Sequence, residues 1–158
     1  MTKSSKPGFK IYGDADSLPN VIKELLFRAA ERLHIPLILI ASKKLATPAS
    51  EYISSEIVPI GADSADHRIV ELVQSGDLVI SADIPLADRI VKKDGVVIDP
   101  RGMIYTKENV KERLSVRDLM HDLRAGGIAT SGPKPFDPKT RKTFASQLDR
   151  YLTKRLAG

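Results

Sequence analysis

The sequence contains no cysteine and no tryptophan, and these absences exclude several kinds of chemistry. Without cysteine, the chain has no disulfide, no thiolate nucleophile and no cysteine-ligated zinc. Aromatic residues make up 5% of the chain, which argues against a stacking platform for single-stranded nucleic acid. No apolar run approaches the roughly 20 residues that span a bilayer, so no membrane partner is expected. The three histidines, at positions 34, 67 and 121, lack metal-ligand spacing.

The composition of the chain is that of an ordinary folded domain. The chain has 158 residues, of which 42% are hydrophobic and 28% are charged, so we expect one α/β domain over residues 9–158. Residues 1–8 have two lysines but no apolar segment behind them, which predicts a disordered tail and not a signal peptide. Cytoplasmic residence is the resulting expectation. The net charge of +5 permits a polyanionic partner without requiring one.

Strand-like and helix-like segments alternate along the chain. Continuous aliphatic runs predict buried strands, and apolar residues at three- and four-residue spacing predict amphipathic helices. This alternation indicates an α/β fold, with three α/β/α layers and a mainly parallel sheet. The expected strands cover residues 9–13, 35–41, 56–60, 77–81, 95–99 and 103–105. The expected helices cover residues 20–33, 64–74, 83–93 and 106–124, with a last helix after Pro138.

Two aspartates follow the first predicted strand. Asp14 and Asp16 stand one residue apart, and Pro19 then opens a predicted helix. Side chains at i and i+2 of a strand point to the same face, so both carboxylates project together if strand geometry continues through Asp16. The alternative is that one aspartate caps the helix and the other is solvated.

Other acids follow later strands of the same predicted sheet. Asp63 and Asp66 follow one strand, and Asp83 follows the next. Because parallel strands end at one edge, these acids converge with Asp14 and Asp16. Five carboxylates repel one another unless a cation such as Mg²⁺ or Mn²⁺ lies between them, and such an ion promotes phosphodiester hydrolysis. Taken singly, Asp83 is better explained as a helix cap, and Asp63 and Asp66 as solvated acids of a first helical turn; it is their shared position that favours a site.

The long predicted helix supplies a second candidate group. At about 100° per residue, Arg113, Arg117 and Arg124 fall within roughly 40° of one another between two apolar arcs. Arginines set among apolar residues need partners, because a desolvated guanidinium is costly when unpaired. The acid cluster and a bound phosphate are both possible partners, and a purely structural ion pair is the other interpretation.

The segment 126–135 is rich in glycine and proline and is predicted to be a loop. Its Thr130, Ser131, Gly132 and Lys134 would let a phosphate approach the backbone, but a plain linker explains them equally well. The spacing of a P-loop is absent, and so is the glycine–serine pattern of an acyl-transfer nucleophile.

With these residues described, the chain resembles the YaiI/YqxD family of uncharacterised bacterial proteins, known as domain of unknown function 188. The resemblance covers nearly everything from Lys10 to Leu152. Its motifs are the following: Asp14-Ala15-Asp16, Pro19-Asn20-Val21-Ile22-Lys23-Glu24, Phe27-Arg28-Ala29-Ala30-Glu31-Arg32, Gly76-Asp77-Leu78-Val79-Ile80-Ser81-Ala82-Asp83-Ile84-Pro85-Leu86-Ala87, Asp99-Pro100-Arg101-Gly102 and Thr130-Ser131-Gly132-Pro133.

The resemblance implies a fold similar to the PIN and NYN nuclease superfamily, whose strand-end acids hold Mg²⁺ or Mn²⁺ for RNA cleavage. Asp14 and Asp83 match the positions of such acids, and Arg101 lies in a matching motif. Two departures stand out. Gly13 replaces a usual valine, and Ser17-Leu18 replaces a common Ala-Cys, so any thiol role proposed for the family is absent.

The leading hypothesis is therefore a metal-dependent ribonuclease or related phosphodiesterase. Asp14, Asp16 and Asp83 would act in catalysis and bind metal with Asp63 and Asp66, while Arg101 and the three helix arginines would bind substrate phosphate. One alternative is a non-catalytic RNA-binding or interaction domain on the same scaffold. A haloacid-dehalogenase-like phosphatase fits less well, because Pro19 leaves no room for the flap that those enzymes need after their two aspartates.

Overall fold

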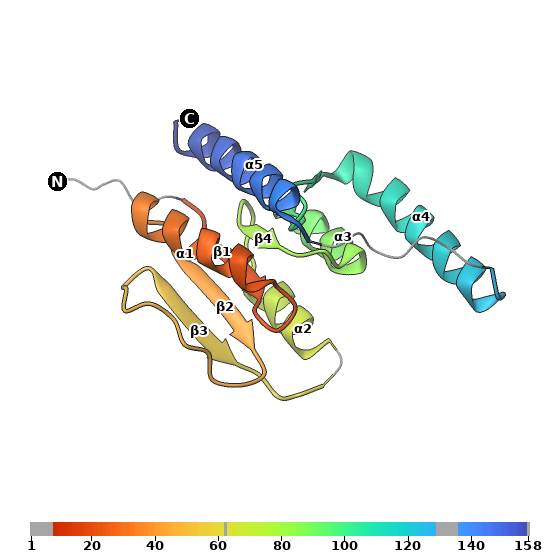
Figure 1. Cartoon of the computed structure of the whole chain (residues 1–158), viewed down its shortest axis with the longest axis horizontal. Helices are drawn as coiled ribbons and strands as arrows, with labels where there is room; N and C mark the ends of the chain where they lie inside the picture. Colours follow the sequence, from red (N-terminus) through yellow and green to blue (C-terminus); the bar gives the residue numbers. More distant parts are fainter. Residues whose placement is uncertain (1–7, 62, 129–135, 158) are drawn as a thin grey trace.

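A six-stranded sheet forms the middle layer of the protein (Figure 1). The protein is described from a computed structural model, which covers residues 8–61, 63–128 and 136–157. The strand order is β3-β2-β1-β4-β5-β6, and every neighbouring pair is parallel except β5 and β6. The strands are β1 (Ile11–Asp14), β2 (Leu37–Ala41), β3 (Ile53–Ile57), β4 (Leu78–Ile80), β5 (Val96–Ile98) and β6 (Ile104–Tyr105).

Helices cover both faces of this sheet, which confirms the expected three-layer α/β/α architecture. Alternate residues of β1 point to opposite faces, so Ile11 belongs to one apolar cluster and Tyr12 to the other. The first cluster includes α1 (Asn20–Leu33) and α5 (Pro138–Ala157), and the second includes α2 (Ser64–Leu72) and α3 (Ile84–Lys92). Helix α4 (Lys107–Ala125) adds only Val110 to the second cluster.

The direction of chain progression reverses at β1. From β1 the chain moves outward through β2 to β3, then returns to β4 on the other side of β1 and continues outward to β5. In open α/β sheets, ligands bind beyond the carboxyl ends of the strands where the order reverses in this way. The exits of β1 and β4 are therefore the first place to look for a site.

One local prediction was wrong, and one stated condition is not met. The strand expected at residues 56–60 is β3, and it covers Ile53–Ile57 instead. Its position follows from its pairing with β2, from Leu37 opposite Ile53 to Ala41 opposite Ile57. Strand geometry also does not continue through Asp16, because the chain turns directly after Asp14.

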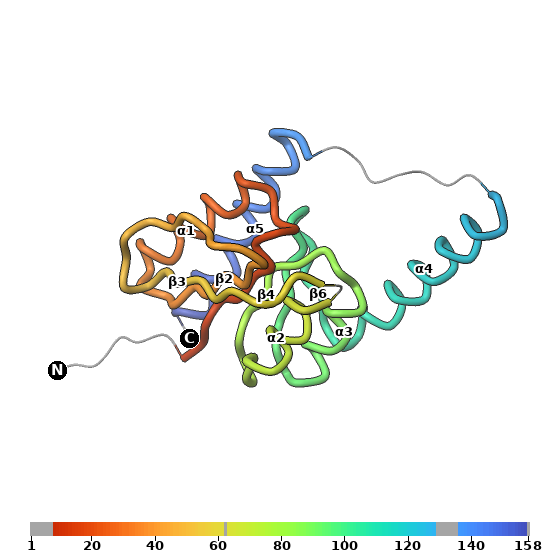
Figure 2. The backbone as a smooth tube through the Cα atoms, turned by 90° about the horizontal axis from the view of Figure 1, so that it is seen from below, coloured from red at the N-terminus to blue at the C-terminus, as the bar shows by residue number. Residues whose placement is uncertain are grey.

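The expected burial of the long helix was wrong as well. Figures 1 and 2 show α4 extending away from the sheet, and Val110 is the only buried residue of this helix. Val116, Leu119 and Met120 keep 45%, 55% and 39% of their surface exposed. The apolar arc beside the helix arginines is thus open to solvent, and the arginines themselves are exposed and not desolvated.

Two expectations lie wholly or largely outside the described residues. These are the disordered tail at 1–8, of which only Gly8 is described, and the central part of the predicted loop at 126–135. Among the helices that the structure describes, none combines the length and the apolar character needed to cross a bilayer.

Candidate functional site

A cleft of about 430 Å³ opens beyond the carboxyl ends of β1, β2 and β4. The five aspartates expected to converge all line this cleft, although they come from three separate parts of the chain. Asp14 and Asp16 follow β1, Asp63 and Asp66 stand at the start of α2, and Asp83 stands at the start of α3. The sheet topology therefore brings together residues that are up to 69 positions apart in the printed sequence.

The aspartates after β1 are fixed by a tight turn. The Asp14 carboxylate accepts a hydrogen bond from the Asp16 backbone N–H at 3.0 Å, which bends the chain out of the strand. The Asp16 carboxylate in turn accepts one from the Ser42 N–H at 2.9 Å. Asp16 thus ties the turn to the end of β2 instead of standing parallel to Asp14. Burial raises the pKa of Asp14, and the nearby Asp16 charge raises it further.

Asp83 caps α3 from the cleft side. Its Oδ1 accepts a hydrogen bond from the Leu86 N–H at 2.9 Å, and its own N–H donates to Ser81 Oγ at 2.9 Å. The structure therefore confirms the alternative interpretation that Asp83 caps a helix. A cap uses one carboxylate oxygen, so capping does not prevent the carboxylate from facing the cleft.

Asp66 is the most perturbed carboxyl group of the cleft. Its pKa is raised to about 7, first by partial burial, then by the charge and side-chain hydrogen bond of Asp83, and then by the charges of Asp14 and Asp63. The like charges that were expected from the sequence are therefore close enough to affect one another. This crowding is the electrostatic signature of a site that favours a cation.

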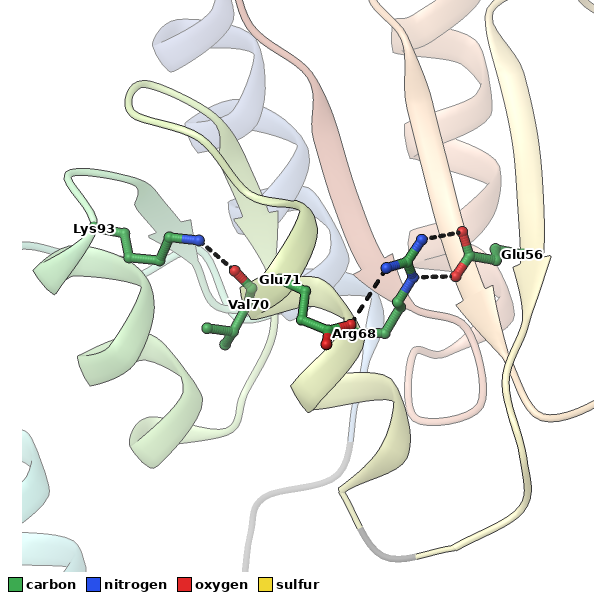
Figure 3. A network of polar contacts seen from close by, with 5 residues as sticks. All are labelled: Glu56, Arg68, Val70, Glu71 and Lys93. Carbon is green, nitrogen blue, oxygen red and sulfur yellow. Dashed lines mark hydrogen bonds and ion pairs between the residues drawn. The ribbon is translucent and has the colours of Figure 1, made fainter.

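Helix α2 is held in place by a network of polar contacts two residues beyond Asp66 (Figure 3). Arg68 forms a two-pronged pair with Glu56 of β3 and a further contact with Glu71 at 3.3 Å. On the opposite side of the helix, Lys93 donates a hydrogen bond to the Val70 carbonyl. These contacts fix α2 between β3 and the end of α3, and so they fix Asp66 relative to Asp83.

The predicted substrate-binding arginines do not gather at this cleft. Arg101 is exposed on the turn directly after Pro100, which lines the cleft. Arg113 contacts the Met103 sulfur, and Arg117 pairs with the neighbouring Asp118 at 3.1 Å. Arg124 lies near the end of the projecting α4. None of these four arginines is among the described residues that line the cleft.

The sequence argument missed the serine hydroxyls of the cleft. Ser17, Ser42, Ser64 and Ser81 all line it. Ser42 and Ser81 directly follow β2 and β4, so the rule that located the aspartates would also have located these two. Hydroxyl groups supply both a donor and an acceptor, which suits a site for phosphate and hydrated cations.

The donor set is compatible with a hydrated Mg²⁺ or Mn²⁺ ion. Across residues 8–61, 63–128 and 136–157, no three acidic or histidine side chains are arranged to enclose a metal ion by themselves. Mg²⁺ commonly takes only one or two carboxylates, keeping several waters and binding substrate phosphate oxygens. A cleft with separated carboxylates and hydroxyls therefore fits Mg²⁺ better than it fits a metal that needs a closed protein cage.

Comparisons with known proteins identify similar chains. A model of the uncharacterised YaiI/YqxD family matches residues 12–154. Among curated proteins, a UPF0178 protein of Geobacter metallireducens is 54% identical over 145 residues, which covers 92% of this chain and 94% of the relative. UPF0178 proteins of Hahella chejuensis and of Janthinobacterium sp. are 52% and 50% identical, each over 92% of this chain, and cover 97% and 96% of those relatives. No solved structure matches.

Proposed function

The chain belongs to the YaiI/YqxD family, and from the geometry of its cleft we propose that it is a divalent-metal-dependent phosphodiesterase that cleaves RNA. The single observation that carries this proposal is the crowding of carboxylates at the reversal point of the sheet, where Asp66 has its pKa raised to about 7 partly by Asp83 and Asp14. The choice of RNA rests on the resemblance to the PIN and NYN nucleases.

Asp66, Asp83 and Asp14 would hold the Mg²⁺ or Mn²⁺ ion in part through bound water, because Asp83 and Asp14 are the acids whose charges act most strongly on Asp66. Asp16 and Asp63 would act through bound water, since the Asp16 carboxylate is engaged by Ser42 and Asp63 is exposed. When bound, the ion would polarise the phosphate and lower the pKa of a water molecule, which are the usual contributions of a metal to phosphodiester hydrolysis.

The protein groups around the cleft would orient the reactants. The start of α2 lines the cleft without a side-chain cap, and the N–H groups of such a helix start attract phosphate oxygens. The Asp83 carboxylate is kept in one orientation by Leu86 N–H, and that of Asp14 by Asp16 N–H. Arg101 would contact the substrate beside the cleft, while Arg113, Arg117 and Arg124 would do so only where a long substrate reaches α4.

The test is to replace Asp14 and Asp83 separately by asparagine. Asparagine caps a helix about as well as aspartate does, so Asp83→Asn removes the charge and keeps the α3 cap. We expect each variant to bind Mn²⁺ at least about tenfold more weakly, measured by electron paramagnetic resonance, and to lose RNA cleavage. The matched control is Asp122→Asn, an exposed acid on α4 away from the cleft.

Two outcomes would count against this function. Unchanged Mn²⁺ affinity in both variants would remove the metal site. RNA binding that needs no metal and gives no cleavage would select the non-catalytic RNA-binding alternative. The dehalogenase-like phosphatase is not proposed, because only the five residues 15–19, which end in the Pro19 cap, connect Asp14 to the start of α1, and they leave no space for a flap.

A further inference from the structure

The positive charge of the chain is concentrated on one helix. Helix α5 carries six basic residues and one acidic residue, so its formal charge of +5 equals that of the whole chain. The rest of the sequence is therefore neutral in sum. Such charge asymmetry is characteristic of surfaces that contact a polyanion.

The basic residues of α5 form a stripe on the side opposite the core. Phe144, Leu148 and Leu152 of this helix are buried against the sheet. At about 100° per residue, the opposite arc of roughly 120° contains an uninterrupted set of basic and hydroxyl side chains. We call this set the α5 stripe, and all of its members are exposed to solvent: Lys139, Lys142, Thr143, Ser146, Arg150, Thr153 and Lys154.

The stripe is available for a ligand. Its cations Lys142, Arg150 and Lys154 have no ion-pair partner among the residues that the structure describes. A shallow groove of about 510 Å³ runs along it and is lined by stripe residues together with Gln147. Hydroxyl and amide donors between cations are the groups that commonly contact phosphate oxygens in nucleic-acid complexes.

The stripe also lies beside the acidic cleft. Pro100 lines the cleft, and two residues later Gly102 packs directly on α5. A Cβ atom added to Gly102 would lie 3.1 Å from Thr143 Cγ2 and 3.2 Å from the Thr143 carbonyl oxygen. Figure 1 shows α5 running along the same face as α1. At 1.5 Å per residue, the stripe extends for about 22 Å from Lys139 to Lys154.

We propose that the α5 stripe binds the phosphate backbone of a nucleic-acid strand whose scissile phosphate enters the cleft. This inference rests on the proposed function and extends it by assigning a substrate-binding surface. An acidic cleft repels a polyanion, so a neighbouring basic surface is needed for the strand to associate. The exposed arc has no aromatic side chain on which bases would stack, so binding depends on phosphate charge and not on base sequence.

The experiment measures binding of a labelled single-stranded RNA by fluorescence anisotropy in the presence of a chelator. The test variant is Lys142→Gln with Arg150→Gln. The control is Arg28→Gln with Lys111→Gln, which removes the same charge from exposed positions on α1 and α4. Thermal unfolding of both double variants verifies that they fold like the unmodified chain.

We expect the test variant to bind RNA roughly tenfold more weakly at low salt. Its plot of log affinity against log salt should become less steep by about 1.4, because each lost contact to a single strand removes about 0.7 from the slope. The control variant should keep most of the affinity. The same measurement with a DNA strand of the same sequence shows whether the stripe binds the phosphodiester backbone of RNA, of DNA or of both.

Three results would overturn the inference: no RNA binding by the unmodified chain at low salt, equal losses in the test and control variants, or tighter binding to anionic lipid vesicles than to RNA. The result is separable from the cleavage chemistry because the chelator removes metal. Stripe-dependent binding with no cleavage after Mn²⁺ is added back would support this inference and count against the proposed function. Cleavage with Mn²⁺ that is unchanged by the Lys142 and Arg150 substitutions would do the reverse.

Discussion

Gly13 lies in β1 directly before Asp14, and its missing side chain leaves space that Leu18 fills. A Cβ atom at this position would lie 2.9 Å from Leu18 Cδ1 and 3.4 Å from Leu39 Cδ2. Leu18 is buried and also lines the cleft. The resembling family commonly has valine at position 13 and cysteine at position 18. The two departures therefore compensate in volume, with a large residue placed where its neighbour is small.

This compensation predicts a non-additive pair of substitutions. Gly13→Val alone should destabilise the fold by about 1 to 3 kcal/mol through overpacking, and Leu18→Cys alone by about 2 kcal/mol through a cavity. The double variant should be more stable than the sum of the two losses predicts, by at least about 1 kcal/mol. Urea unfolding of the four proteins under reducing conditions measures this coupling, and additive losses would show that the two sites do not share space.

At the scale of elements, the sequence predicted where helices begin and end better than it predicted whether they are buried. The helix from Asn20 to Leu33 was expected with its observed bounds, because periodicity and Pro19 are local signals. The expected start of the long helix at residue 106 was confirmed to within one residue, because Thr106 caps α4 and Asn109 completes a capping box. The burial of α4 was wrong, because an apolar arc shows which side would pack but not whether anything packs there.

Strand and site predictions failed where non-local pairing decides the outcome. β3 was misplaced because Ile57, Val58 and Ile60 look like a strand, while pairing with β2 selects the more polar segment from Ile53. The convergence of the five aspartates was predictable from the rule that parallel strands end at one edge. The α5 stripe was not predicted, because the position of α5 beside the turn at Gly102 depends on tertiary packing.

The exposure of α4 predicts a gradient of amide exchange along the helix. Only Val110, in its first turns, is buried, so the later turns lack the packing that stabilises most helices. We expect the amides of residues 116–125 to exchange at least about tenfold faster than those of α5, a helix of similar length with three core residues. Hydrogen exchange by NMR in dilute solution measures both helices at once. Equal protection of α4 and α5 would contradict this expectation.

For the whole molecule, the acidic cleft makes stability depend on pH, and the proposed metal site predicts a further dependence on Mg²⁺. The pKa of Asp66 is raised to about 7 by burial and by Asp83, Asp14 and Asp63, so the folded chain keeps a proton that the unfolded chain releases. Stability therefore falls as pH rises from about 4 to about 7. Burial raises the pKa values of Asp14 and Asp99 as well, so they contribute in the same direction.

We predict that Asp66→Asn flattens this dependence. The variant should be more stable than the unmodified chain at pH 8 by about 1 to 2 kcal/mol, after allowance for solvent screening of a partly exposed group, and little changed at pH 4. Mg²⁺ should raise the unfolding temperature of the unmodified chain more at pH 8 than at pH 5, because protons compete with the ion. Urea and thermal unfolding at these pH values provide the measurements. Parallel pH profiles for the two proteins would contradict the prediction.

The outer edge of β3 has a consequence for behaviour at high concentration. A strand at the end of a sheet leaves one row of backbone groups unpaired, and such an edge can recruit another chain into a growing aggregate. Here the edge is only five residues long, carries the Glu56 charge and is followed within two residues by Pro59, which has no N–H to donate. These features protect the sheet against edge-to-edge extension, so the chain should remain dispersed where a longer apolar edge would precipitate.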